Sequence, residues 1–203
     1  KVRTEVIAHK MVDPRMRIRP NPQEVERAAR MLVEAERPML YVGDELYKTN
    51  SVDKAVKLAE TLGMVVSQPR QVFANFPQDH HLWESSRGNM RTHNPDVIMN
   101  VGNKLQHNRP NPLVPRSVKF IDMRNDAASM GNVITVDVPL VADVGHGVDD
   151  LLAALEDVMT PSLKKKAQER TDKIRALTER NRKLRNVMTR NPDWDNSPLL
   201  SDR

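Results

Sequence analysis

The residues of this sequence that could bind a ligand lie at the ends of short apolar runs. Gly43-Asp44-Glu45 follows one run, Gly102-Asn103-Lys104 follows another, and Asp122 closes a third. The runs read as β-strands, and in parallel sheets ligands bind where the strands end. A glycine turn that opens a helix can cradle a phosphate, and a strand-end aspartate can accept both hydroxyls of a ribose. The first chemistry to consider is therefore nucleotide binding by Gly43, Gly102, Asn103, Lys104 and Asp122.

Each of these residues also has a purely structural interpretation. Asp44 and Glu45 place two carboxylates where a phosphate would lie, so they would repel it, and they could instead cap the following helix. Lys104 could be a solvated cation on an ordinary turn. Asp122 could cap the next turn through backbone groups of Asn125 or Ser129. The residues alone leave both interpretations open.

The elements that would position these turns alternate between helices and strands. Apolar residues at helical spacing predict a helix from Pro22 to the Arg37-Pro38 stop, one that Ser51 caps and Gly63 ends, and one near 147–159. Strands are expected at 39–42, 64–67, 97–101, 117–122 and 133–138. This alternation predicts an α/β fold: a Rossmann-like parallel sheet of about five or six strands with helices on both faces.

A long charged helix is expected from Pro161 to about residue 189. Residues 164–190 hold 11 of the 32 Lys and Arg but only three acids, whereas the whole chain has a formal net charge of +5. A narrow apolar stripe, interrupted by Arg170 and Asn181, suits a helix that lies on a surface. The helix lacks interleaved aromatic residues, so a solvated charged linker is favoured and nucleic-acid binding is not expected.

Composition argues against several other classes. No apolar run is long enough to span a membrane, and no secretory signal pattern opens the chain. Cysteine is absent, which excludes disulfides and thiolate zinc sites and suits a cytoplasmic location. Asp79-His80-His81 are adjacent residues, which rarely reach one ion together, and no third ligand follows at helical spacing. We therefore expect no metal site in this sequence, and Trp83 reads as a core or domain-contact residue.

An ordered series of segments gives the chain a family resemblance. The segments are PNPQEVERAARMLVEAERPMLYVG at 20–43, KLAETLGMVV at 57–66, FANFPQDHHLW at 73–83, NPDVIMNVGNKL at 94–105, VKFIDM at 118–123 and VPLVADVGHGVDDLLAAL at 138–155. The series resembles the central domain of thiamine diphosphate-dependent enzymes of the acetolactate synthase and 2-oxo acid decarboxylase group. It covers roughly residues 20–160, which is the length of one domain.

The resemblance implies a larger enzyme of which this chain is one part. We expect a lead-in from a preceding domain at 1–20, the central domain at 21–160 and a basic helical linker into a following domain at 161–203. In this family one flanking domain supplies a glutamate that activates the cofactor, and the other a Gly-Asp-Gly motif that holds magnesium and the diphosphate. No Gly-Asp-Gly occurs in this sequence, so thiamine diphosphate and Mg²⁺ would bind outside it, and we assign it no catalytic residue.

The resemblance also bears on ligands and partners. In some relatives the central domain binds FAD or ADP, and an arginine near the second turn meets the phosphates; Lys104 or Arg109 could take that part here. In other relatives the domain serves only in packing. The parent enzyme would be a lyase or a transferase acting on 2-oxo acids or related carbonyl substrates. Its expected partners are the flanking pyrimidine- and diphosphate-binding domains and further copies in a homodimer or homotetramer.

Two other functions fit the same sequence. The chain could be a stand-alone ADP-, FAD- or NAD-binding module that shares only the fold. It could also be a basic adaptor that binds nucleic acid through residues 161–190. The first predicts tight nucleotide binding by this chain alone, and the second predicts binding that disappears when the helix is deleted.

Overall fold

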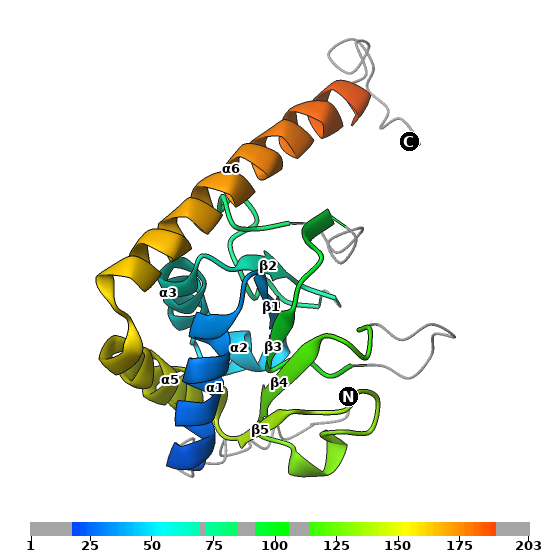
Figure 1. Cartoon of the computed structure of the whole chain (residues 1–203). Helices are drawn as coiled ribbons and strands as arrows, with labels where there is room; N and C mark the ends of the chain where they lie inside the picture. Colours follow the sequence, from blue (N-terminus) through cyan, green and yellow to red (C-terminus); the bar gives the residue numbers. More distant parts are fainter. Residues whose placement is uncertain (1–17, 70–71, 85–91, 106–113, 190–203) are drawn as a thin grey trace, which may run out of the picture.

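A five-stranded parallel β-sheet forms the centre of the molecule. The computed structural model describes residues 18–69, 72–84, 92–105 and 114–189 (Figure 1). The strands are β1 (Pro38–Val42), β2 (Val65–Ser67), β3 (Val97–Val101), β4 (Lys119–Arg124) and β5 (Val138–Val141). They lie in the order β2-β1-β3-β4-β5, and every neighbouring pair is parallel. The predicted parallel α/β fold is confirmed.

The helices begin and end close to where their sequence signals place them. They are α1 (Pro22–Glu34), the short α2 (Asp44–Lys48), α3 (Val52–Leu62), the 3₁₀ turn η1 (Ala127–Ser129), α5 (Val144–Val158) and α6 (Pro161–Thr189). Asn21 caps α1 by accepting a bond from the backbone N–H of Gln23, and Asp143 caps α5 in the same way. Ser51 does not cap α3 as predicted: its hydroxyl donates to the carbonyl of Thr49 instead.

Two strand predictions require correction. β4 runs to Arg124, so Asp122 lies inside the strand rather than at its end. The alternating run at 133–138 is not a strand, because β5 begins only at Val138. Ile134 and Val136 instead lie in the loop before β5 and pack against the sheet. A loop that covers a sheet buries alternate side chains, so it imitates the period of a strand.

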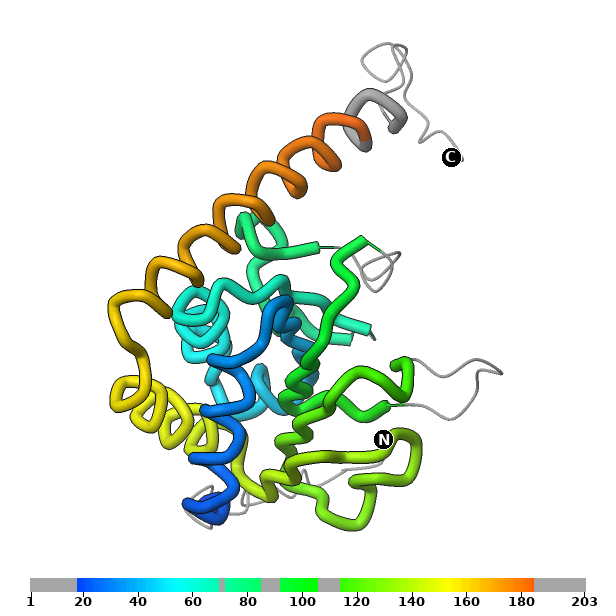
Figure 2. The backbone as a smooth tube through the Cα atoms, in the orientation of Figure 1, coloured from blue at the N-terminus to red at the C-terminus, as the bar shows by residue number. Residues whose placement is uncertain are grey.

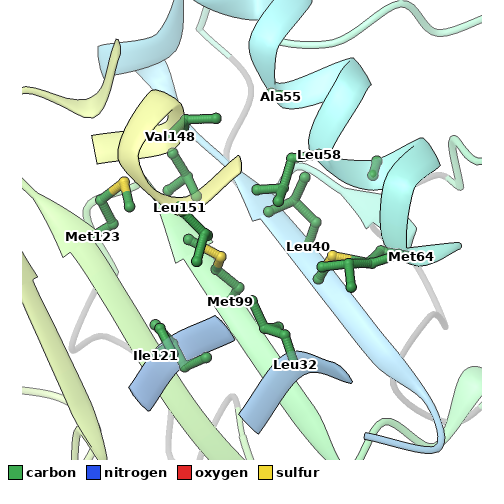
Figure 3. Packing of buried hydrophobic residues seen from close by; sticks show 14 of the residues in the cluster. Leu32, Leu40, Ala55, Leu58, Met64, Met99, Ile121, Met123, Val148 and Leu151 are labelled. Carbon is green, nitrogen blue, oxygen red and sulfur yellow. The ribbon is translucent and has the colours of Figure 1, made fainter. Parts of the chain in front are cut away.

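The two faces of the sheet have different covers. On one face, side chains of α1, α3 and α5 such as Leu32, Leu58 and Leu151 pack with Leu40 and Met99 of the strands (Figure 3). On the opposite face, buried strand residues pack mainly with loop residues; the cluster comprises Met39, Tyr41, Val65, Ile98, Val114 and Phe120, with Leu105, Val118, Ile134, Val136 and Ile174 against it. In the described part of the chain α1, α3 and α5 therefore share one face, whereas α6 contacts both clusters through Ile174.

The handedness of the connections explains this arrangement. Crossovers between parallel strands are right-handed, so the side on which a connection lies depends on the direction in which the chain moves across the sheet. The chain moves one way from β1 to β2, through α3, and the other way from β3 through β4 to β5. The connections from β3 to β4 and from β4 to β5 must therefore cover the opposite face. In their described parts, the 3₁₀ turn η1 is the one helical element. α1 and α5 precede and follow the sheet, so they can join α3.

The basic helix α6 docks on the domain along α3, and Figure 2 shows it continuing past the sheet. Gly63, at the end of α3, has a φ of +61°, and a Cβ there would lie 2.2 Å from the carbonyl oxygen of Ala167. Arg170 donates to the carbonyls of Ala35 and Leu62, which follow α1 and end α3. Cations are favourable at helix C-termini, where carbonyls lack partners. Arg170, which seemed to interrupt the apolar stripe, is therefore part of the docked face.

We predict that Arg170→Ala will lower the free energy of unfolding by about 1–3 kcal/mol, because it leaves carbonyls at two helix ends unpaired. Arg180→Ala on the exposed face of the same helix removes an equal charge and should change it by less than about 0.5 kcal/mol. Urea unfolding of both variants, followed by circular dichroism, tests this. Equal stability of the two variants would contradict the docking role of Arg170.

Candidate functional site

The turns after β1 and β3 touch each other at the carboxyl edge of the sheet. The Gly43 N–H donates to the carbonyl of Val101 at 2.9 Å. A Cβ on Gly43 would lie 2.2 Å from the Cα of Asn103, and one on Gly102 would lie 2.6 Å from the Cβ of Glu45. Gly102 also has a φ of +66°, which favours glycine. Both predicted glycines therefore permit a direct contact between two turns.

Asp44 and Glu45 extend this contact toward the neighbouring strands on either side. Asp44 Oδ1 accepts a bond of 2.9 Å from Asn75 Nδ2, in the segment after β2. Glu45 Oε2 accepts one of 3.1 Å from the backbone N–H of Asn125, directly after β4. Both carboxylates lie in the first turn of α2, where the helix dipole favours negative charge. Their side chains also connect the residues that follow β2, β1, β3 and β4.

Glu45 is the more constrained of the two carboxylates. Its own backbone N–H donates to the carbonyl of Gly102 at 3.3 Å, so both ends of the residue are engaged. Burial raises the pKa of Glu45 above its ordinary value of 4.5, although the Asn125 N–H and the charge of Arg124 act in the opposite sense. A carboxylate held in this way forms part of the wall of the edge rather than a solvated charge.

Asp122 is engaged inside the protein through both of its oxygens. Arg124 lies two residues along β4, and its Nη2 and Nε atoms lie 2.6 and 3.1 Å from Oδ2 and Oδ1. Asn100 Nδ2, from the adjacent β3, also donates to Oδ1 at 2.8 Å. Asp122 is 1% exposed and Arg124 is 3% exposed. Arg124 in turn donates to the hydroxyl and the carbonyl of Ser129, while the Asn125 N–H is bound by Glu45.

Of the remaining predicted residues, Asn103 joins the network of Asp122, whereas Lys104 does not. Asn103 is buried, and its carbonyl accepts a bond of 2.8 Å from Asn100 Nδ2. Lys104 is exposed and near Asp126; a hydrogen bond from Ser129 and, more weakly, the Lys104 charge lower the pKa of Asp126. Arg109 lies outside the described residues. Gly43, Gly102, Asn103 and Asp122 therefore form one packed edge, and Lys104 lies outside it.

The described residues of this edge line one small cavity. A cavity of about 10 Å³ is lined by Leu105, Phe120, Asp122, Arg124, Ser129, Gly131, Val133 and Ile134. That volume holds about one water molecule. A groove of about 610 Å³ lies elsewhere, between α1 and α5, with Val25 and Ala29 facing Ala153 and Ala154. The residues of the described edge therefore fit hydrogen bonding within the protein better than they fit a dinucleotide.

The histidine pair lies under α6. His80 Nε2 is 3.2 Å from Glu60 Oε1, and His80 Nδ1 accepts from the backbone N–H of Leu82. Burial, His80 and two arginines of α6 lower the pKa of His81. Trp83 is buried and stacks on Phe76, as expected of a core residue. Within the described residues, no group of three or more His, Asp or Glu side chains is arranged to hold a metal ion.

The buried polar residues Asn75, Asn100 and Arg124 were missed by sequence reasoning. Asn100 interrupts the apolar run 97–101, and Arg124 follows Asp122 at a spacing of two. In a strand that spacing places both side chains on the same face, so it could have signalled the ion pair. Asn75 lies in an irregular segment and carries no such pattern.

A parallel α/β sheet of this topology, with glycine turns at the switch between β1 and β3, defines a Rossmann-like domain. The family model "Thiamine pyrophosphate enzyme, central domain" matches residues 25–155. The chain therefore belongs to the central-domain family of thiamine pyrophosphate (thiamine diphosphate) enzymes, as the sequence resemblance implied.

Relatives of known name agree with this assignment. Acetolactate synthase isozyme 3 large subunit of Escherichia coli (strain K12) is 27% identical over 143 residues, covering 65% of this chain and 25% of that protein. Acetolactate synthase large subunit of Corynebacterium glutamicum is 25% identical over 142 residues, covering 66% and 23%. The chain spans about a quarter of the length of these curated relatives. No described helix is both long and apolar enough to cross a membrane.

A solved structure shares the fold. Benzoylformate decarboxylase from Polynucleobacter necessarius matches 77% of this chain and 30% of that chain, with a TM-score of 0.59 and 20% sequence identity. At that level of identity the likeness concerns the fold alone.

We predict that Arg124→Met will lower the free energy of unfolding by about 3–5 kcal/mol, because it leaves Asp122 buried and unpaired. The double variant Asp122→Asn with Arg124→Met removes both charges and should recover part of that loss. Guanidinium unfolding of the two variants and the parent chain measures the difference. A double variant no more stable than the single one would show that the ion pair is not the cause.

Proposed function

We propose that the chain is the central scaffold domain, with its following linker, of an enzyme that uses thiamine diphosphate and Mg²⁺ on 2-oxo acids or related carbonyl substrates. The observation that carries this proposal is the family match over 25–155, in a sequence that contains no Gly-Asp-Gly. When bound in the flanking domains, the cofactor would supply the electron sink for carbanion chemistry. This chain would supply no reacting group and would not be catalytic alone.

Contacts at both ends of the described domain support a scaffold role. The carbonyl of Ile18 accepts from the N–H of Asp143, and Arg19 pairs with Asp150 of α5. At the other end, Arg170 and Arg182 tie α6 to backbone carbonyls of the domain. A domain anchored in this way at 18–19 and along α6 would hold its two neighbours in fixed positions. We propose boundaries at 1–20, 21–160 and 161–203, as the family resemblance implies.

The charges of α6 support a linker rather than a nucleic-acid interface. Lys166 pairs with Glu36, and Arg170 and Arg182 face backbone carbonyls, so three of its cations are directed inward. On the exposed surface, three acids are interspersed among the cations: Glu169, Asp172 and Glu179 lie among Lys164, Lys165, Lys173, Arg175, Arg180 and Lys183. A continuous positive stripe, which phosphate binding requires, is therefore interrupted by acids in the described part of α6.

The remaining features of the parent enzyme are extensions of the same proposal. We infer a homodimer or homotetramer, in which flanking pyrimidine- and diphosphate-binding domains complete the active sites. The named relatives are synthases and the structural neighbour is a decarboxylase, so the parent would be a transferase or a lyase. A cysteine-free chain suits the cytoplasm.

The test is a calorimetric titration with thiamine diphosphate and Mg²⁺ of the full-length polypeptide that contains this sequence. We expect saturable binding by that polypeptide and none by the 203-residue chain, which serves as the control. If neither binds, the resemblance extends to the fold only. If the 203-residue chain binds by itself, its role as a scaffold is wrong.

A further inference from the structure

We propose that Glu45 takes the place of a nucleotide phosphate at the switch point of this sheet, so that the central domain works without FAD or ADP. The inference rests on the proposed function, because it concerns which ligands the central domain of that enzyme needs. It assigns a role to one carboxylate and to the two glycines that surround it.

The position of Glu45 is where an open α/β sheet usually binds its ligand. The chain leaves β1 toward β2 on one side, whereas β3 leads toward β4 on the other, so the crevice between β1 and β3 is the topological switch point. Glu45 follows β1 by three residues. Its backbone N–H meets Gly102 after β3, and its side chain meets Asn125 after β4. One residue thus bridges the carboxyl ends of three strands.

The bond to Asn125 resembles the contact that a phosphate would make. Phosphates in such folds accept hydrogen bonds from backbone N–H groups beyond the strands. Glu45 Oε2 accepts such a bond at 3.1 Å, and the nearby Arg124 favours its negative charge. The carboxylate therefore provides, within the chain, the kind of acceptor that a bound nucleotide would otherwise bring.

The two turns beside Glu45 are already in close contact. Gly43 and Asn103 approach so closely that even a methyl group on Gly43 would lie 2.2 Å from the Cα of Asn103. Similarly, a Cβ on Gly102 would lie only 2.6 Å from the Cβ of Glu45. A pyrophosphate would have to separate these turns and break the bond from Gly43 to Val101.

The charges of the described edge also oppose a dinucleotide. Asp44, Glu45 and Asp122 place three carboxylates along it. The guanidinium of Arg124 is already bound to Asp122 and Ser129. Lys104 is exposed and near Asp126, away from the contact between the turns. Among the described residues at this edge, no cation is therefore left to neutralise a pyrophosphate.

The first experiment adds ADP and FAD separately, at millimolar concentration, to the full-length polypeptide and to the 203-residue chain. We expect no shift in melting temperature in either and no visible flavin absorbance in the purified full-length protein. A saturable upward shift with ADP or FAD would overturn the inference. Thiamine diphosphate binding is measured on the same full-length sample, so failure of this inference and failure of the proposed function give different results.

The second experiment uses Glu45→Gln, which keeps an oxygen that can accept from the Asn125 N–H and removes the charge. Burial raises the folded-state pKa of Glu45 above 4.5, so the folded protein favours the protonated carboxyl. The contribution of this group to the free energy of unfolding is therefore fully present in acid. It is lost as the pH rises through the raised folded-state pKa. Urea unfolding across this range should therefore show Glu45→Gln gaining stability relative to the parent chain as the pH increases toward neutrality.

The matched control is Glu34→Gln on the exposed end of α1, which removes the same charge from a solvated position. Because this side chain is exposed, the urea midpoint of the variant should stay close to that of the parent chain. If the unfolding free energy of Glu45→Gln runs parallel to that of the parent across the same pH range, Glu45 is solvated like Glu34 and does not fill the crevice, and the inference is wrong.

Discussion

The close approach of two backbones, at Gly43 and Asn103, sets the form of the whole carboxyl edge. A Cβ at Gly43 would clash with the Cα of Asn103, so the turns after β1 and β3 meet only because one of them is glycine. Once they meet, the switch point is filled by main chain, and the side chains of Asp44 and Glu45 can reach only sideways. The glycines that suggested a phosphate site from the sequence are thus the residues that allow the two turns to meet.

A second constraint acts at the other side of the domain, where helix ends and a turn present backbone carbonyls to α6. Arg170 reaches the carbonyls of Ala35 and Leu62, and Arg182 reaches those of Gln78 and His80. The concentration of positive charge in 164–190 therefore has a partly internal explanation. Two of these cations are positioned for neutral acceptors, which a count of formal charges along the sequence does not consider.

Periodicity predicted most of the elements, because buried faces repeat every 3.6 or two residues. It placed α6 at Pro161–Thr189 and β3 at Val97–Val101. It failed at 133–138, where a loop over the sheet buries alternate residues. The site was harder to predict from the sequence. An aspartate near the end of a strand gives the same sequence pattern whether it binds a ribose or, like Asp122, pairs with the arginine two residues later.

The same sheet can therefore serve with or without a nucleotide, and the difference lies in very few atoms. A phosphate at a switch point holds neighbouring strand ends together by accepting their N–H groups. Glu45 accepts one such group from within the chain. A carboxylate supplied by the chain avoids the loss of translational freedom that a bound ligand entails, but it cannot be exchanged. A domain whose task is to hold its neighbours in place gains from that permanence, whereas a domain that responds to a nucleotide would not. The fold is compatible with both, so only the residues at the switch point distinguish them.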